Sequence, residues 1–381
     1  MVTQIGASHR RDRLLAAMTM ASSVGLILAA PFALRAGAEF FLPVTAALVI
    51  AVALVPLLEW LERRGMPARL AAFVCLIVFI GIANLAIAAI VLPATDWFAL
   101  LPQRVDRIRT NLSPIIDLYS SLERFVDETT AAFMHSRRST HAVAVETPSS
   151  ILGIIAASAP FAIIQTFFGL LVVYFFLSGW TKMRRRTITS RGSFSSAMTT
   201  ARVIQDVVDA TSSYLLTITL INLTLGGLVA AGLWFMHMPT PLMWGGIAAT
   251  LNYVPYIGPI VAALLLALGG LMTFSDPWYA MLPAVIFVGV HLIEANLITP
   301  LLVARRLTIN PLLILIALSF WGWVWGVAGA LLAVPLLIIA KTVLDASGKP
   351  DIASFLFEDG TLATAPGEPA TNEIAGSATH G

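Results

Sequence analysis

The chain has 381 residues, of which 58% are hydrophobic and only 12% are charged, and its mean hydropathy is +0.87. Average soluble domains carry roughly a quarter charged residues, and a soluble protein of this size is excluded because it could not bury so much apolar surface. The net charge of +2 does not predict an acidic partner, and we expect no nucleic acid partner. We therefore predict an all-α, polytopic integral membrane protein whose surroundings are the lipid bilayer.

Four apolar segments precede the middle of the chain, and each is long enough to cross a bilayer, which takes about 20 residues. They are residues 14–34, 40–60, 71–92 and 151–180. Basic clusters precede the first segment, separate the second from the third and follow the fourth. Because cytoplasmic loops are enriched in lysine and arginine, we place these clusters and the N-terminus in the cytoplasm. The second segment follows the first at once, so we interpret the first as a membrane helix and not as a cleaved signal peptide.

The chain divides into five predicted regions. Residues 1–92 form a cytoplasmic start and three membrane helices. Residues 93–150 form an extracytoplasmic amphipathic segment, which is either a solvated connector or an assembly surface. Residues 151–212 contain the fourth membrane helix and a basic, amphipathic cytoplasmic segment. Residues 213–345 form a C-terminal membrane core, and residues 346–381 are predicted to be a disordered cytoplasmic tail with a cytoplasmic C-terminus.

The membrane core contains two interrupted apolar stretches. Residues 240–272 are interrupted at residues 252–259, and residues 310–340 are interrupted by glycines. Each stretch begins with a capping residue followed by proline, which is a favoured helix start. Two topologies fit this pattern. Either each stretch crosses the membrane fully, which gives eight spans, or each forms a re-entrant hairpin that enters and leaves on one face.

The distribution of charge favours the two hairpins. With eight full crossings, Arg305 and Arg306 would lie outside the cell, against the positive-inside bias, whereas hairpins place them in the cytoplasm. Interrupted helices at membrane depth occur only where protein or a water-filled cavity satisfies the loosened backbone. Two such elements that face opposite sides of the membrane are typical of transporters with inverted repeats.

The motifs of common enzymes are missing from the sequence. It has no phosphate-binding Gly-rich loop with its lysine, and its histidines lack a set of partners with zinc spacing. We recognise no nucleophile and base at membrane depth. We therefore expect no enzyme activity, no cofactor, no metal and no nucleotide partner.

The candidate residues of a substrate or ion pathway lie in the predicted span from residue 277 to 300 and at the two interruptions, the second of which contains Gly322 and Gly326. Polar residues within the predicted span from residue 277 to 300 are costly to bury and often mark such a path, and His291 and Glu294 share a helical face. Alternatively, Glu294 satisfies a loosened backbone or a neighbouring helix. Prolines free backbone carbonyls at the first interruption, although a plain kink in a packed helix would look the same. The set is Asn252, Tyr253, Pro255, Gly258, Pro259, His291, Glu294, Asn296, Gly322 and Gly326.

Five motifs of the core resemble those of one known family. They are residues 239–246 (PTPLMWGG), 252–259 (NYVPYIGP), 294–300 (EANLITP), 310–312 (NPL) and 326–335 (GVAGALLAVP). Their order and spacing are similar to those of the autoinducer-2 exporter (permease-like) family of bacterial membrane transporters, over roughly residues 10–345. The resemblance implies a bacterial inner-membrane protein with eight membrane segments that assembles as a homo-oligomer. Its members have been linked to export of autoinducer-2 and to exchange of sodium or lithium for protons. The tryptophan-rich residues 319–325 depart from the small residues that the family has there.

Three functions fit these observations. The leading hypothesis is a secondary transporter or exporter of a small polar solute, coupled to protons through Glu294. A second hypothesis is a sodium or lithium/proton antiporter, whose partner is a cation. The third, of another class, is a non-transporting membrane scaffold or assembly protein, for which residues 93–150 and the tail would be the working surfaces.

Overall fold

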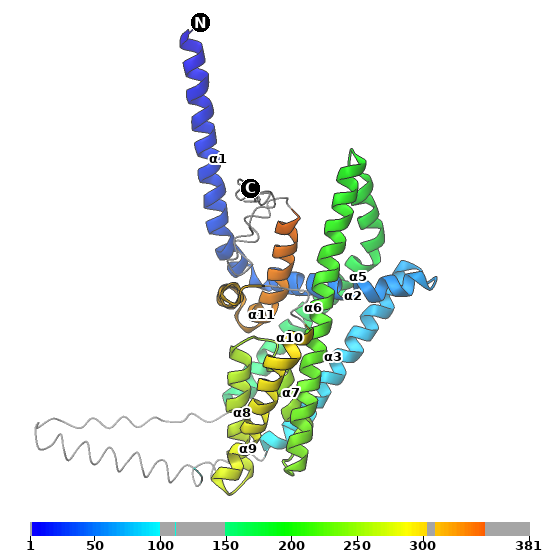
Figure 1. Cartoon of the computed structure of the whole chain (residues 1–381), viewed down its shortest axis with the longest axis vertical. Coiled ribbons are helices and arrows are strands. Elements are labelled where there is room, and N and C mark those ends of the chain that lie inside the picture. Colours follow the sequence, from blue (N-terminus) through cyan, green and yellow to red (C-terminus); the bar gives the residue numbers. More distant parts are fainter. Residues whose placement is uncertain (1, 100–110, 112–148, 303–308, 347–381) are drawn as a thin grey trace, which may run out of the picture.

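The computed structural model describes residues 2–99, 111, 149–302 and 309–346, and Figure 1 shows their arrangement as helices. The N-terminal helices are α1 (Val2–Ala36), α2 (Ala38–Arg63) and α3 (Ala68–Ala99). They are followed by α5 (Ser149–Thr189) and α6 (Phe194–Phe235). The C-terminal helices are α7 (Pro241–Leu251), α8 (Ile257–Thr273), α9 (Pro277–Ile293) and α11 (Pro311–Asp345). A π-helical turn, η1 (Glu294–Ile298), and the short helix α10 (Thr299–Leu302) lie between α9 and α11.

Seven of the described helices are long and apolar enough to cross a membrane. Large apolar side chains cover their outer surfaces, for example Leu26, which is 73% exposed, and Phe167, which is 63% exposed. Exposure of so much apolar surface to water would cost about 25 cal/mol per Å², whereas lipid removes this cost. The predicted fold class, a polytopic α-helical membrane protein with interrupted helices, is confirmed.

The polar residues before three prolines differ in how they begin their helices. Asp276 accepts a hydrogen bond from the backbone N–H of Trp278 at 3.1 Å, and Asn310 accepts one from Leu312 at 2.8 Å. Both are the side-chain caps that satisfy free N–H groups in a first helical turn. Thr240 was predicted to do the same before α7, and this was wrong. Its φ is 54°, it makes no side-chain cap, and its hydroxyl donates instead to the carbonyl of Pro239.

The first interrupted stretch folds as a helical hairpin of α7 and α8 (Figure 1). Far from its tip, the indole of Trp244 on α7 contacts Gly269 on α8, and near the tip Gly258 lies against the carbonyl of Leu251. Between the two helices the backbone leaves the helical conformation, and Tyr256 has a φ of 65°. One of the two predicted topologies requires a hairpin over residues 240–272. The depth of this hairpin in the bilayer stays a prediction.

The second interrupted stretch is a sharp bend within α11. Trp325 and Gly326 have non-helical dihedral angles, and the φ of 63° and ψ of −144° at Gly326 belong to a region that only glycine enters without strain. Beyond the bend, the backbone of Gly329 lies against the carbonyl of Trp321. Residues on both sides of the bend form one buried cluster with Val254 from the tip of the α7–α8 hairpin. The two interruptions therefore meet in space.

Helix α6 connects the two ends of the molecule. Its amphipathic first half continues without a break into an apolar second half, over 42 residues. At Gly226 its backbone approaches Gly245 of α7 so closely that side chains at either position would collide with the other backbone. The lower half of α6 in Figure 1 thereby holds the hairpin in place.

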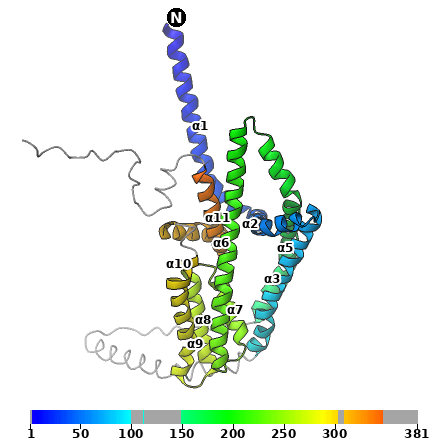
Figure 2. The same cartoon turned by 45° about the vertical axis from the view of Figure 1, so that its right-hand side comes forward.

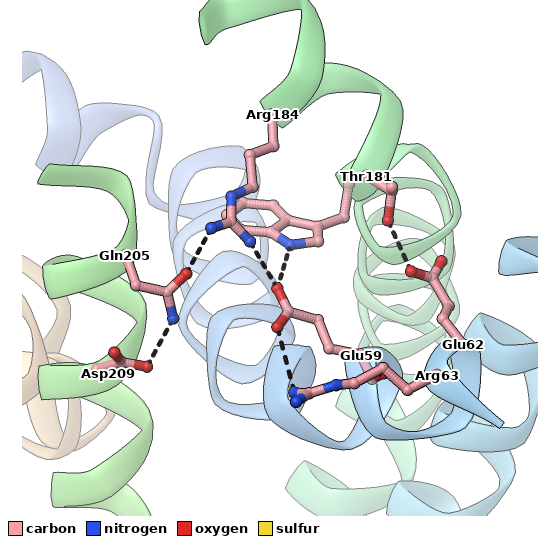
Figure 3. Close-up of polar contacts among 8 residues, drawn as sticks. Glu59, Glu62, Arg63, Thr181, Arg184, Gln205 and Asp209 are labelled. Atoms are coloured by element: carbon pink, nitrogen blue, oxygen red, sulfur yellow. Dashed lines mark hydrogen bonds and ion pairs between the residues drawn. The ribbon is translucent and has the colours of Figure 1, made fainter. Parts of the chain in front are cut away.

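A polar cluster joins α2, α5 and α6 at the other end of α6 (Figure 3). Glu59 of α2 accepts hydrogen bonds from Arg184 at 2.9 Å and from the Trp180 indole at 3.4 Å, both on α5. The second terminal nitrogen of Arg184 donates to Gln205 of α6 at 2.6 Å. Charge-assisted hydrogen bonds of this kind are stronger than neutral ones, and a single arginine here connects three helices.

Replacement of Arg184 by methionine is expected to lower the free energy of unfolding by about 1–3 kcal/mol, because Glu59 and Gln205 both lose a partly buried donor. Arg63→Met is the matched control. Arg63 lies 3.7 Å from the same carboxylate, but its side chain is 75% exposed, so its loss should cost about 0–1 kcal/mol. Thermal unfolding in detergent measures both variants, and equal effects would show that the cluster does not fix the three helices.

Helix α1 projects away from the other helices in both views (Figures 1 and 2). Its last turns contact the bend of α11. The indole of Trp325 donates to the carbonyl of Leu34 at 3.0 Å, while Phe32 and Arg35 both pack on the ring of Trp323. Helix α2 lies crosswise to α6 in both views, and its predicted crossing of the bilayer stays a prediction.

Candidate functional site

A pocket of about 740 Å³ lies where α6, the α7–α8 hairpin, α9 with η1 and α10, and α11 come together. This volume falls in the range of sites for small molecules. Its polar lining residues are Tyr214, Asn252, Tyr256, His291, Glu294 and Thr299. Its apolar lining residues include Ile218, Pro255, Pro259, Ile260, Phe287, Val288, Ile314, Val334 and Ile338.

Glu294 is the buried carboxylate of this pocket, with 5% of its surface exposed. It begins the π-helical turn, and the backbone N–H of Thr299 reaches its carbonyl across five residues. This wider turn brings the Thr299 hydroxyl over the carboxylate, where it donates to Oε1. A carboxylate removed from water requires such partners, because burial of an unpaired charge costs several kcal/mol.

His291 faces the other oxygen of the same carboxylate. Its Nδ1 lies 3.1 Å from Oε2, within ion-pair distance when the imidazole carries both protons. The same Nδ1 is buried, so both oxygens of the carboxylate have a neighbouring polar side chain. The imidazole stacks on the ring of Phe287, with ring centroids 5.8 Å apart and planes 5° apart. This stacking fixes the plane of the imidazole beside the pocket.

Asn252 connects the carboxylate to α6. From the tip of the hairpin, its Nδ2 donates to Oδ1 of Asn222 at 2.9 Å, and its side chain also interacts with Glu294. Asn222 is only 1% exposed, and its own Nδ2 has no hydrogen-bond partner among the described residues. One polar network thus joins α6, the hairpin tip and η1, and it depends on the position of the hairpin tip.

Five of the ten predicted pathway residues line this pocket: Asn252, Pro255, Pro259, His291 and Glu294. The first interruption and the carboxylate of the following span are therefore neighbours in space, although Asn252 and Glu294 are 42 positions apart in the sequence.

The other five predicted residues lie elsewhere. The hydroxyl of Tyr253 donates to Thr219 of α6 at 2.8 Å, and Gly258 packs against Leu251. Asn296 is exposed, and its amide donates to Leu292 of its own helix at 2.8 Å. Gly322 and Gly326 are not among the lining residues, since α11 lines the pocket with Ile314, Val334 and Ile338 instead.

Three residues of the site were not predicted from the sequence. Thr299 stands five residues after Glu294, a spacing that faces the same side only in a π-helix. Tyr214 lies on α6, and nothing in its surroundings in the sequence distinguishes it. Asn222 of α6 was not among the predicted pathway residues, and it accepts a hydrogen bond from Asn252 of the pocket. Arg305, Arg306, most of residues 93–150 and the tail lie outside the described residues.

Comparison with known proteins identifies the family. Residues 17–349 match the model of the AI-2E family transporters. The "AI-2 transport protein TqsA" of Escherichia coli (strain K12) is 26% identical over 340 residues, which cover 88% of this chain and 94% of that protein. The "Putative transport protein YhhT" of the same strain is 25% identical, with 81% of this chain and 85% of that protein covered. The "Putative transport protein YrrI" of Bacillus subtilis (strain 168) is 24% identical, with 80% and 85% covered. The family match extends over all the helices that form the pocket, and the chain belongs to the AI-2E family of transporters.

Proposed function

We propose that this protein is a secondary transporter that moves a small polar solute through the pocket beside Glu294, without chemical change to the solute. The observation that carries the proposal is a buried carboxylate in a pocket formed by two interrupted helical elements. In a membrane protein, ionisable groups and irregular backbone are expensive unless they border a protein interior or a wet cavity.

We further propose that Glu294 and His291 carry the coupled proton. Their side chains are 3.1 Å apart, and imidazole is the side chain that most readily changes its charge near neutral pH. A change of charge on this pair alters the attraction between η1 and Asn252 at the hairpin tip. Protonation and the position of the tip are therefore coupled, which is the link that a proton-driven transporter requires.

The interrupted elements supply places where the chain can change direction during transport. Tyr256 and Gly326 both hold left-handed backbone angles between helical segments, and the segments meet around Val254. We propose that movement of the α7–α8 hairpin against α11 opens the pocket to one side of the membrane and then to the other.

We place the protein in the bacterial inner membrane, with both termini in the cytoplasm, from its basic clusters and its family. We also propose a homo-oligomer. The apolar window of α1 has no buried residue within the single chain, so a second copy can cover part of it. Cysteine labelling at Arg305 tests the topology, because labelling from outside the cell would contradict the two hairpins.

Comparison of the metabolites retained by cells with and without the protein tests the proposed function. We expect the retained amount of at least one small solute to differ severalfold between cells with and without the protein. Cells with Glu294→Gln should resemble cells without the protein, because a neutral amide cannot carry the proton. Glu39→Gln, which also removes one carboxylate but at an exposed position on α2, is the control. The name of the TqsA relative makes autoinducer-2 the first solute to measure. If no metabolite changes at matched expression, the scaffold hypothesis replaces the transporter.

A further inference from the structure

The pocket is amphipathic, with its polar groups gathered around one carboxylate. Asn252, His291, Glu294 and Thr299 belong to one set of contacts at the end where the hairpin tip meets η1. Most of the remaining lining is aliphatic or aromatic, from Phe287 on α9 to Val334 on α11. A solute that fills a site of about 740 Å³ must therefore present both a polar head and an apolar body.

When His291 is neutral, the described lining residues carry a net negative charge, which lies on Glu294. No lysine or arginine is among the described residues that line the pocket, and Glu294 is the one carboxylate among them. An anionic head would meet Glu294 without a compensating cation from these residues, and burial of such a pair is strongly unfavourable. A cationic head would form a charge-assisted hydrogen bond to the same group.

The head would have to displace a neighbour of Glu294. Oε1 accepts a hydrogen bond from the hydroxyl of Thr299, and Nδ1 of His291 lies 3.1 Å from Oε2. An ammonium group can take the place of the imidazole at Oε2. The aromatic ring of Tyr256, which also lines the pocket, favours a cation or an aromatic ring nearby.

We propose that the solute class of this pocket is the amphipathic amine, an ammonium head that binds Oε2 of Glu294 in place of His291 with an apolar body against the α8, α9 and α11 walls. This inference rests on the proposed function only in taking the pocket as the transport site. The binding itself can be measured without transport.

The test compares three probes with one skeleton and different heads, namely 3-phenylpropylamine, 3-phenylpropanol and 3-phenylpropanoate. Binding to the purified full chain in phosphatidylglycerol nanodiscs is measured by calorimetry at neutral pH. We expect the amine to bind at least tenfold more tightly than the alcohol, and the carboxylate not to compete. Methylamine, which lacks the apolar body, should also bind at least tenfold more weakly than 3-phenylpropylamine.

Glu294→Gln should remove the preference for the amine over the alcohol while the alcohol still binds, which separates loss of the charge from loss of the fold. Glu39→Gln should keep the preference.

Equal binding of the amine and the alcohol, or binding of the carboxylate, would overturn the proposed class and leave the metabolite comparison unaffected. Amine binding in a protein that changes no metabolite would instead overturn the proposed function. If phosphatidylethanolamine in the nanodisc abolished amine binding, the ammonium would belong to a lipid headgroup, and the proposal of a solute would fall.

Discussion

Gly258→Ala is expected to reduce transport more than tenfold and to destabilise the protein by about 3 kcal/mol or more, because the substitution forces open the tip of the α7–α8 hairpin. A Cβ at this position would lie 1.8 Å from the carbonyl oxygen of Leu251. The obstacle is backbone and not a flexible side chain, so the hairpin can accept the methyl group only by separating its two helices. Asn252 would then lose its position against Asn222 and Glu294.

Gly289→Ala is the matched control for this variant. Gly289 lies in α9, and a Cβ there would meet no heavy atom within 4 Å. Alanine has a higher helix propensity than glycine by about 1 kcal/mol, so this variant should unfold at the same or a higher temperature and retain its transport. Thermal unfolding in detergent and flux in proteoliposomes measure the pair. Wild-type behaviour of Gly258→Ala would rule out the tight hairpin.

The second large effect is expected for Gly329→Ala in α11. The added Cβ would lie 2.0 Å from the carbonyl oxygen of Trp321, so the two parts of α11 could no longer pack at the bend. We expect at least a tenfold loss of transport, again with a loss of about 3 kcal/mol of stability. The apolar wall that Val334 and Ile338 contribute to the pocket lies just beyond this bend and would move with it.

Gly322→Ala is the corresponding control, because Gly322 lies in the same helix and has open space around its Cβ position. The two alanine variants change composition identically and differ only in whether the new methyl group meets backbone. If both retained transport and melting temperature, the bend would not matter. If Gly329→Ala kept its melting temperature but lost transport, the bend would be required for movement and not for folding.

The interruptions were predictable from sequence because their cause is local. Proline lacks an N–H and disfavours a continuous helix, and the break around Pro255 lies between Leu251 and Ile257, with Pro259 in the first turn of α8. Glycine alone enters the backbone region that Gly326 occupies, and the bend of α11 lies there. The surroundings of Thr240 misled the prediction, because its left-handed backbone turns the side chain away from a capping position.

The composition of the chain by itself determined that lipid surrounds it, and local residues determined the cap of α11, the break around Pro255 and the bend at Gly326, because these properties act over a few neighbouring residues. Tertiary structure alone decided which groups meet. Asn252 and Thr299 come to Glu294 and Asn222 comes to Asn252, all from separate elements, and the pocket wall from α11 consists of Ile314, Val334 and Ile338 in place of the predicted glycines. Such contacts depend on how helices pack across the whole chain. The π-helical turn, which places Thr299 beside Glu294, could not be recognised from the residue pattern around it.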